Sequence, residues 1–351
     1  MKKDISNGLI NSNDINMKIY ISILFIVLLF SCSDKKEIRI QYIGDVELEY
    51  SNFDEYHLDS LKILYPTGIH SFKKHLLLIE PKNNPTISFW SMDNLEYEFS
   101  SGYKGGGPDE LIHPRADYFT ISDSSFYILD SNIEREMIIS NDSVIHIISN
   151  IPILIPDAIN QMVHLDSCYI MSGLTSGKGK EHLMYRQGEE YTEFGHYIND
   201  EHLLNEELAI YNYKFIAGIK GHNEIFDFYQ YRNLIRRYDI QGNLKEEIQL
   251  RGIPERDNSF DKLRDGTIQP YRGYLFVTDD YIYSLYYENI SNNQLYAEEI
   301  IPELQIWDWN GYLIRRIRFN HSFSRFTVAN GRIYALNTRQ PYTIYVYEIG
   351  K

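Results

Sequence analysis

The chain has 351 residues, of which 43% are hydrophobic and 24% charged, and its formal net charge is −15 at pH 7. This balance excludes a disordered or fibrous protein, and the acidic charge argues against binding to nucleic acid or to anionic lipid headgroups. The 30 tyrosines and 17 phenylalanines favour β-strands, because aromatic side chains fit a pleated, half-buried surface. The tyrosines can pack between sheets with their hydroxyls in water, or form an aromatic platform for a sugar.

The N-terminal segment carries the pattern of a signal peptide. An apolar run over 19–30 follows Met17 and Lys18. As a helix this run rises only about 18 Å, which is too short to cross a hydrocarbon core of about 30 Å. We therefore interpret 1–31 as a signal peptide with Lys18 as its positive region; a short membrane anchor or an uncleaved signal is the alternative. Residues 1–16 are polar, so Met17 is a second candidate for the true start of the chain.

The end of this run resembles the lipobox of bacterial lipoproteins, through Leu29, Phe30, Ser31 and Cys32. In that motif a small residue precedes a cysteine that is lipidated and becomes the mature N-terminus; Phe30 is bulkier than the residue usual at its position. The resemblance implies a lipidated Cys32, a polar tether over 32–36, and membrane attachment through the lipid rather than through the acidic protein body. We expect the protein in the cell envelope, anchored at the outer membrane, on either its periplasmic or its surface side.

Only one other cysteine, Cys168, is present. Two cysteines are too few for a disulfide framework, and they do not have zinc-type spacing. Cys168 lies in a strand-like run over 164–170 and is predicted to be a buried, small apolar residue rather than a nucleophile.

An eleven-residue unit recurs in the rest of the chain, over 238–248, 307–317, 184–194 and 89–99. Each copy reads as a strand, a tight turn and a second strand, because Gly242 and Gly311 in the two clearest copies supply a positive φ at little steric cost. The unit is interpreted as the outer hairpin of a four-stranded blade. Two further strands, predicted over 214–219 and 224–229, precede the copy at 238–248 and form the inner half of that blade.

Counting these units predicts six blades, near 66–100, 115–150, 155–196, 207–250, 267–319 and 321–349. The last blade supplies only three strands, and the strand-like segment 37–50 is expected to add the fourth and close the ring, which protects sheet edges. We therefore predict an all-β fold over 37–351: one six-bladed β-propeller of four-stranded antiparallel blades, closed by an N-terminal strand. The best helical signal is short, over 202–208. The long connectors 176–181 and 251–266 are loops of the kind that carry function.

A glycine-rich motif follows the first predicted outer hairpin, with Gly102, Gly105, Gly107, Pro108 and Glu110. It resembles the signature of the six-bladed β-propeller lipoproteins of the Bacteroidetes, the TolB-like or NHL-like propellers, although Leu111 stands where Phe is usual. The resemblance implies a six-bladed ring in the cell envelope and brings no catalytic residues with it. NHL-type lyases hold a metal with several channel histidines, and no such set can be mapped onto this sequence.

Other candidate chemistry is weak. The glycines at 105–107 lead into Pro108 and predicted strands rather than a helix, so a tight crossing between blades is favoured over a phosphate loop. No metal or cofactor is predicted, because the histidines fall on different blades or loops without ligand spacing; they are His164, His182, His196, His202, His222 and His321. The arginines at 236–237 and 315–318 are interpreted as solvated faces of outer hairpins.

Two tripeptides, at 59–61 and 142–144, resemble the sequon at which Bacteroidetes glycosylate the hydroxyls of exported proteins. Ser60 and Ser143 are therefore candidate surface modification sites.

The absence of a concentrated catalytic set in the sequence favours a binding or interaction module, whose partner is a protein, a peptide or a glycan at the propeller face. One alternative is a hydrolase or lyase, which requires a cluster of carboxylates or histidines at the channel mouth. The other is a structural scaffold of an outer-membrane complex, which requires an exposed apolar patch on the outer wall.

Overall fold

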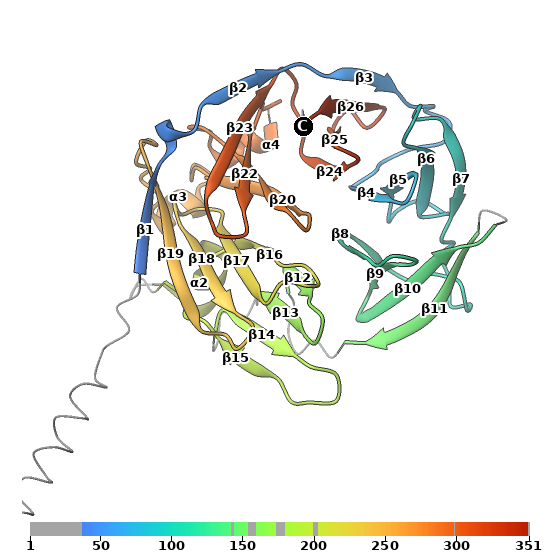
Figure 1. Ribbon diagram of the computed structural model, residues 1–351, viewed down its shortest axis with the longest axis horizontal. Helices are drawn as coiled ribbons and strands as arrows, with labels where there is room; N and C mark the ends of the chain where they lie inside the picture. The colour runs from blue at the N-terminus through green and yellow to red at the C-terminus, as the bar shows by residue number, and fades with distance from the viewer. Residues whose placement is uncertain are drawn as a thin grey trace, which may run out of the picture. The chain divides into compact units, whose positions relative to one another are not determined.

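The computed structural model describes residues 37–349, except 142–143, 154–158, 173–179, 199–202 and 298. The predicted signal peptide and Cys32 therefore lie outside the described residues. The described residues from Ile38 onwards form one compact unit, and their strands are arranged in six sheets around a centre (Figure 1). The all-β six-bladed propeller predicted from the sequence is confirmed.

The first three blades each contain four antiparallel strands that follow one another in the chain. Blade 1 consists of β4 (Gly68–Phe72), β5 (His75–Ile79), β6 (Ile87–Ser91) and β7 (Tyr97–Ser101). Blade 2 consists of β8 (Pro114–Ile121), β9 (Phe126–Asp130), β10 (Ile133–Ile139) and β11 (Ile145–Pro152). Blade 3 consists of β12 (Gln161–His164), β13 (Tyr169–Ser172), β14 (His182–Tyr185) and β15 (Thr192–Phe194).

The last three blades each receive an additional strand from the N-terminal part of the propeller. Blade 4 contains β16 (Lys214–Ala217), β17 (Glu224–Tyr229), β18 (Ile235–Asp239) and β19 (Leu244–Arg251). Blade 5 contains β20 (Arg272–Val277), β21 (Tyr281–Tyr286), β22 (Glu303–Asp308) and β23 (Leu313–Phe319). Blade 6 contains β24 (Arg325–Ala329), β25 (Arg332–Leu336) and β26 (Thr343–Glu348). The innermost strands, β4, β8, β12, β16, β20 and β24, contact one another in this order, and β24 returns to β4.

The N-terminal segment runs along the rim of three blades (Figure 1). β1 (Glu37–Tyr42) lies beside β19 of blade 4, and β2 (Leu48–Ser51) pairs in parallel with β23 of blade 5. β3 (Asp54–His57) pairs antiparallel with β26 and completes blade 6. Closure by an N-terminal strand is thus confirmed, but the assignment of 37–50 as that strand is wrong. β3 has no apolar alternation, since all four of its residues are exposed, and for this reason its sequence did not signal a strand.

The second strand of a blade is covered on both faces by neighbouring blades. Every residue of β5 and of β9 is buried, so these strands read as continuous apolar runs instead of alternating ones. The apolar core is divided among the interfaces between sheets. Phe89 of blade 1, for example, packs in one cluster with Phe126 and Ile128 of blade 2.

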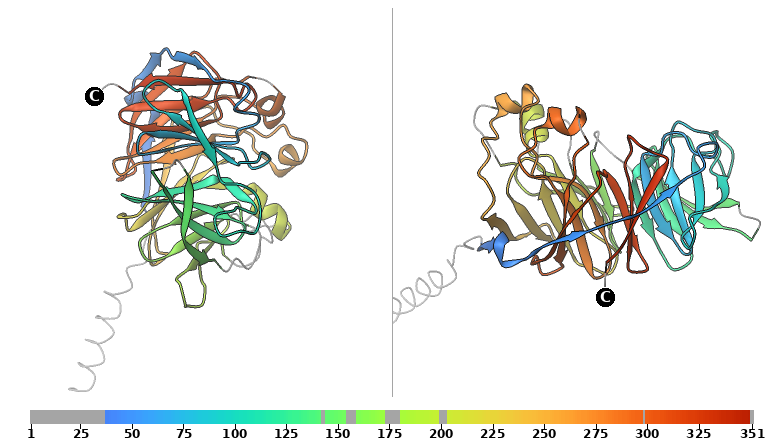
Figure 2. Two further views of the ribbon diagram at one scale, coloured as in Figure 1. Left: turned by 90° about the vertical axis from the view of Figure 1, so that its right-hand side faces the viewer. Right: turned by 90° about the horizontal axis from the view of Figure 1, so that it is seen from above.

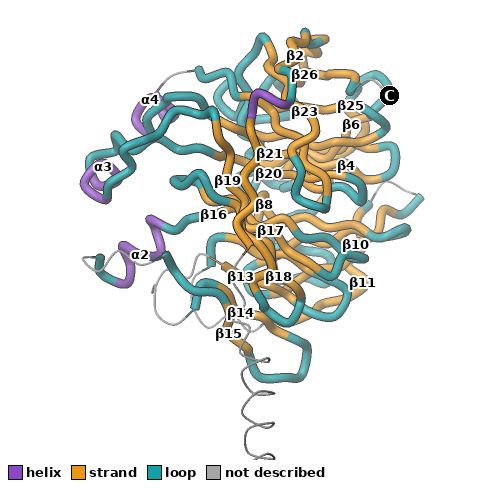
Figure 3. Tube along the Cα trace, turned by 60° about the vertical axis from the view of Figure 1, so that its left-hand side comes forward, coloured by secondary structure: helices purple, strands orange, loops and turns teal. Residues whose placement is uncertain are grey.

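Three short α-helices are present in the described part of the chain: α2 (Asn205–Tyr211), α3 (Phe260–Arg264) and α4 (Asn292–Ala297). All three lie on the same face of the ring (Figures 2 and 3), which we call the helical face. α2 lies three residues after the start of the helix predicted over 202–208, and α3 occupies the predicted loop 251–266. None of the helices among these residues has the length and apolar character needed to cross a membrane.

Candidate functional site

A cavity of about 580 Å³ opens where the starts of β16, β20 and β24 meet on the helical face. We call it the mouth cavity. Its walls include Tyr213, Phe215, Tyr274, Phe323 and Arg325, with amide side chains beside them. No Asp, Glu or His is among the described residues that line it. Loops and strand starts of different blades therefore combine into one hollow that is rich in aromatic rings.

A second cavity, of about 440 Å³, occupies the central channel below the first. All six innermost strands contribute to its wall, and Tyr274 lines both cavities. Unlike the mouth cavity it has acidic residues in its wall, namely Asp117, Asp123 and Asp279. Carboxylates therefore line the channel below the mouth cavity, together with the cation of Lys220.

Two polar groups of the channel wall, His70 and Asp117, have partners within the protein. His70 Nε2 donates a hydrogen bond to the Ala116 carbonyl at 2.9 Å, and its ring stacks on Phe119 with 4.4 Å between centroids. Burial lowers the pKa of His70 to about 4, so this imidazole is neutral at physiological pH. Asp117 accepts two hydrogen bonds from Arg115, at 3.0 and 2.6 Å.

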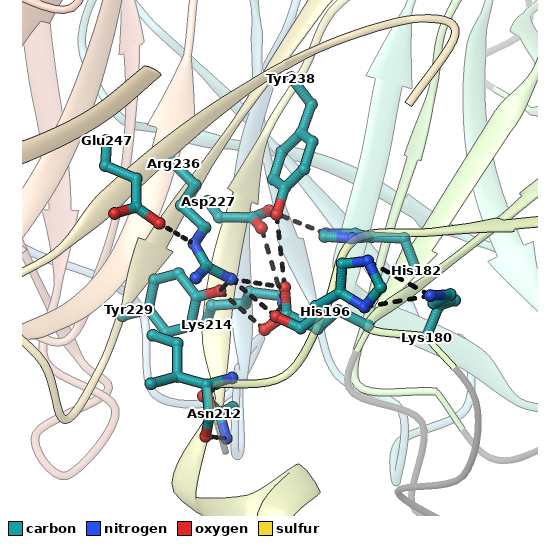
Figure 4. Close-up of polar contacts among 12 residues, drawn as sticks. Lys180, His182, His196, Asn212, Lys214, Asp227, Tyr229, Arg236, Tyr238 and Glu247 are labelled. Carbon is teal, nitrogen blue, oxygen red and sulfur yellow. Dashed lines mark hydrogen bonds and ion pairs between the residues drawn. The ribbon is translucent and has the colours of Figure 1, made fainter. Parts of the chain in front are cut away.

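A buried charge cluster lies between blades 3 and 4 (Figure 4). Glu181 precedes β14, His182 opens it, Lys214 opens β16 and Asp227 lies in β17. His182 Nε2 is 3.0 Å from Asp227 Oδ1, and Lys214 Nζ is 3.1 Å from Glu181 Oε1. Arg236 Nη1 adds a bond to Glu181 Oε2 at 3.1 Å. All five side chains are buried. We refer to these five residues as the charge cluster.

The carboxylates and the imidazole of this cluster have the composition of a metal site, since donor atoms of Glu181, His182 and Asp227 lie within 4.8 Å of one another. The position of a cation is nevertheless taken by the Lys214 ammonium group, which also lies 3.5 Å from Asp227 Oδ2. Burial alone would raise the pKa of Asp227, but the neighbouring His182, Lys214 and Arg236 together hold it below its ordinary value. The two carboxylates are thus neutralised by two cationic side chains, and the arrangement fits an internal ion-pair network.

The glycine motif lies in the crossing from β7 to β8, which joins blade 1 to blade 2. Gly102 has a φ of +76°, and Glu110 Oε2 accepts a hydrogen bond from the Gly107 amide at 2.7 Å. A Cβ atom on Gly105 would lie 1.9 Å from Glu110 Oε2. Pro108 stands inside the turn that Glu110 closes. The motif therefore builds a compact loop around a carboxylate, and it does not approach the mouth cavity.

The predicted modification sites are only partly visible. Ser60 is exposed on a turn that follows β3, whereas Ser143 and the lipidation site Cys32 lie outside the described residues. Cys168 is buried as a free thiol, and burial raises its pKa, as expected for an unreactive core residue.

The structure brings the predicted histidines into separate environments. His164 Nδ1 contacts Glu134, His182 belongs to the charge cluster, and His196 contacts Lys180. His222 stacks on Trp309, and His321 contacts Glu55. His202 lies outside the described residues. The His196 carbonyl also accepts a hydrogen bond from Arg236 Nη1 at 2.8 Å, so His196 borders the charge cluster that contains His182.

Sequence reasoning missed the residues that form the mouth cavity. Arg325 fell within the last predicted blade, over 321–349, and the sequence assigned it no role. A signal was present, since Lys214, Arg272 and Arg325 each open the innermost strand of a blade. A cation at this position is unexpected for a strand that is enclosed by its neighbours, and it marks the helical-face end of the channel.

Comparison with known proteins supports the fold. The family model of the TolB-like six-blade propellers matches residues 49–331. Among solved structures, a Bacteroides vulgatus member of the DUF4221 family is 11% identical, with a TM-score of 0.54 over 86% of this chain and 97% of that one. A Bacteroides fragilis protein described as a candidate for export is 12% identical, with a TM-score of 0.50 over 82% of this chain and 88% of that one.

No curated protein matches the sequence. Because the family model covers well over half of the chain and the six sheets close a ring, the chain belongs to the TolB-like six-bladed propeller family.

Proposed function

We propose that the protein is a lipid-anchored binding module of the cell envelope that captures a ligand in the mouth cavity. The observation that carries this proposal is the cavity itself, whose volume of about 580 Å³ is that of a small-molecule site. It lies on a rigid ring, and its wall is drawn from several blades, so a ligand there would contact many loops at once. Such a site needs little reorganisation to bind.

The chemistry of the cavity wall favours binding over catalysis. A hydrolase or lyase needs an acid and a base at the reacting bond. Among the described lining residues of the mouth cavity there is no carboxylate and no imidazole. In the deeper channel, His70 is engaged with a backbone carbonyl and its pKa is lowered to about 4. The other histidine of this wall, His164, is 2.9 Å from Glu134 Oε1, so both imidazoles are held by partners inside the protein.

The envelope location is supported by the apolar run over 19–30 and by the lipobox pattern that ends at Cys32. The resemblance of the fold to a Bacteroides fragilis export candidate agrees with it. A lipid on Cys32 would hold the protein at the membrane, so that the acidic propeller need not touch lipid. Labelling of cells with an alkyne fatty acid tests this step: the wild type should carry the label and Cys32→Ala should not.

The binding site is tested by blocking the mouth cavity. Ser322 lines it, and Ser322→Trp would fill it with an indole. Thr192→Trp adds the same group at an exposed position of β15 and serves as the control. On an array of glycans and peptides, we expect the full-length protein and T192W to share one binding profile that S322W loses. A profile unaffected by S322W would contradict the proposal.

An exposed stripe on the outer wall favours a scaffold as the second candidate function. Ile38, Ile40 and Tyr42 lie at alternate positions of β1 and are 54%, 45% and 56% exposed. β1 is also the last strand of its sheet, and exposed edge strands invite pairing with another chain. The double variant Ile38→Thr, Ile40→Thr should abolish co-purification of a stoichiometric partner if this edge is the contact surface, and otherwise leave it unchanged.

A further inference from the structure

We propose, on the basis of the binding function proposed above, that the ligand of the mouth cavity is a carboxylated sugar whose carboxylate is held by Arg325. The first observation is the charge of the wall. The whole chain carries a formal net charge of −15, yet the cavity is lined by Arg325 and Arg339 and by no described carboxylate. A positive hollow in an acidic protein attracts small anions and repels cations.

The second observation concerns the hydrogen-bond partners of the Arg325 guanidinium group. Its Nη1 donates to the Ser324 carbonyl at 2.8 Å, and its Cζ lies 5.0 Å from the centre of the Tyr274 ring. Its Nε is buried and has no hydrogen-bond partner. A buried donor without an acceptor is costly, so the protein keeps here a group that a ligand oxygen would satisfy.

Other cations of the propeller are held by partners inside the protein. Arg115 is paired with Asp117, and Lys214 and Arg236 are paired with Glu181. Arg256 and Arg272 are buried away from the mouth cavity and donate to backbone carbonyls. Arg325 forms no ion pair with any residue that the structure describes, although it opens an innermost strand as Lys214 does. A planar guanidinium that retains free donors is suited to bind a carboxylate with two parallel hydrogen bonds.

The remaining wall suits a sugar ring. Tyr213, Tyr274 and Phe323 present aromatic rings against which the C–H face of a pyranose can pack. Asn160, Gln230 and Asn337 supply amides that can both donate and accept, as the hydroxyls of a sugar require. The combination of one unpaired guanidinium, several rings and several amides favours a uronic acid over a peptide, whose ammonium group would find no carboxylate in the wall.

The probe pair is digalacturonate and its dimethyl ester, which differ in charge but hardly in shape. With the full-length protein in detergent, isothermal titration should show the acid binding at least about tenfold more tightly than the ester, since a hydrogen bond to a charged carboxylate is stronger than one to a neutral ester. Arg325→Gln should remove this difference, and Arg325→Lys should retain part of it. Raising the salt concentration should weaken the acid alone.

Arg332→Gln is the matched control, because Arg332 lies in the same blade at the start of β25 and pairs with Glu348 on the surface. It should bind both probes as the wild type does, and a thermal melt should show that R325Q is folded. Equal binding of acid and ester, unaffected by R325Q but lost in S322W, would overturn the carboxylate inference and leave the binding function standing. Binding of a peptide carboxylate without digalacturonate would overturn the sugar class. If neither probe binds but the array profile is still lost in S322W, the carboxylated-sugar proposal is overturned and the binding function stands. If S322W keeps the array profile, the binding function is overturned as well.

Discussion

Lys214 Nζ lies 3.1 Å from Glu181 Oε1 in the interface between blades 3 and 4. Both side chains are buried, and Asp227 and Arg236 surround them (Figure 4). A buried charge is tolerated only when it is paired, so each member of the charge cluster depends on the others. The cluster therefore fixes how blade 4 packs against blade 3, beside the apolar contacts of the same interface.

Lys214→Met keeps the length of the side chain and removes its charge. We expect the free energy of unfolding to fall by about 3–5 kcal/mol, because the carboxylates of Glu181 and Asp227 then remain buried with too little positive charge. Lys245→Met is the control, since Lys245 is 50% exposed in its pair with Asp239 and such pairs contribute about 0–1 kcal/mol. Denaturant unfolding measures both. Equal stability of the two variants would show that the charge cluster does not hold the blades together.

His70 makes the stability depend on pH. Its pKa is about 4 in the folded protein against an ordinary value of 6.5, because burial disfavours the charged form. The stability that depends on a neutral His70 is fully present above pH 6.5. It is lost as the pH falls towards 4, because the unfolded chain then binds a proton that the folded chain does not. The total loss in the free energy of unfolding is about 3 kcal/mol.

His70→Gln retains a donor for the Ala116 carbonyl and removes the titration. Between pH 7 and pH 4.5 the free energy of unfolding should fall further for the wild type than for H70Q. The difference should approach the total of about 3 kcal/mol. Parallel pH profiles of the two proteins would exclude His70 as the source.

Two neighbouring glycines of the interblade motif, Gly105 and Gly106, differ in the space that a side chain would find. In Gly105→Ala the new Cβ would overlap Glu110 Oε2, so Glu110 must release the Gly107 amide. The expected loss is about 1 kcal/mol, the contribution of one hydrogen bond. Gly106→Ala is the control, because a Cβ there meets no atom within 4 Å. Thermal melts should place G106A with the wild type and G105A below it. The reverse order would mean that the Glu110 contact does not stabilise the loop.

Phe53 anchors the strand that closes the ring. It precedes β3 and packs on Phe319 and Tyr345, with 5.2 and 4.9 Å between ring centroids. Phe53→Ala should lower the free energy of unfolding by about 2–4 kcal/mol, somewhat less than for a fully buried ring. Tyr50→Ala removes a ring that is 75% exposed, and a change within about 0.5 kcal/mol is expected. If F53A unfolds like Y50A, the ring is held closed by β3 backbone pairing alone.

The outer hairpins could be predicted because each turn is specified by residues that are adjacent in the sequence. Gly242 and Gly311 have φ values of +83° and +81°, and the same residue type at the same position in two copies revealed the repeat. β3 could not be predicted, because its exposed residues carry no pattern and its partner β26 lies at the other end of the chain. Closure was anticipated, but not the strand that achieves it.

The candidate site depends on contacts that no local pattern records. Glu181, Lys214 and Asp227 meet only because blades 3 and 4 are neighbours in the ring. Arg325 is distinguished from Arg272 by the direction of its side chain. Arg272 is buried between blades and donates to the Arg232 carbonyl, whereas Arg325 lines the mouth cavity. In the sequence both are simply basic residues at the start of a strand.

Hydrogen–deuterium exchange of the full-length protein, with and without the ligand that the array selects, tests the central claim most directly. Binding in the mouth cavity predicts added protection at 213–215, 273–274 and 322–325, with no change at the turns 278–280 and 329–331 on the opposite face. Protection confined to 38–42 on the outer wall, or to those opposite turns, would contradict it.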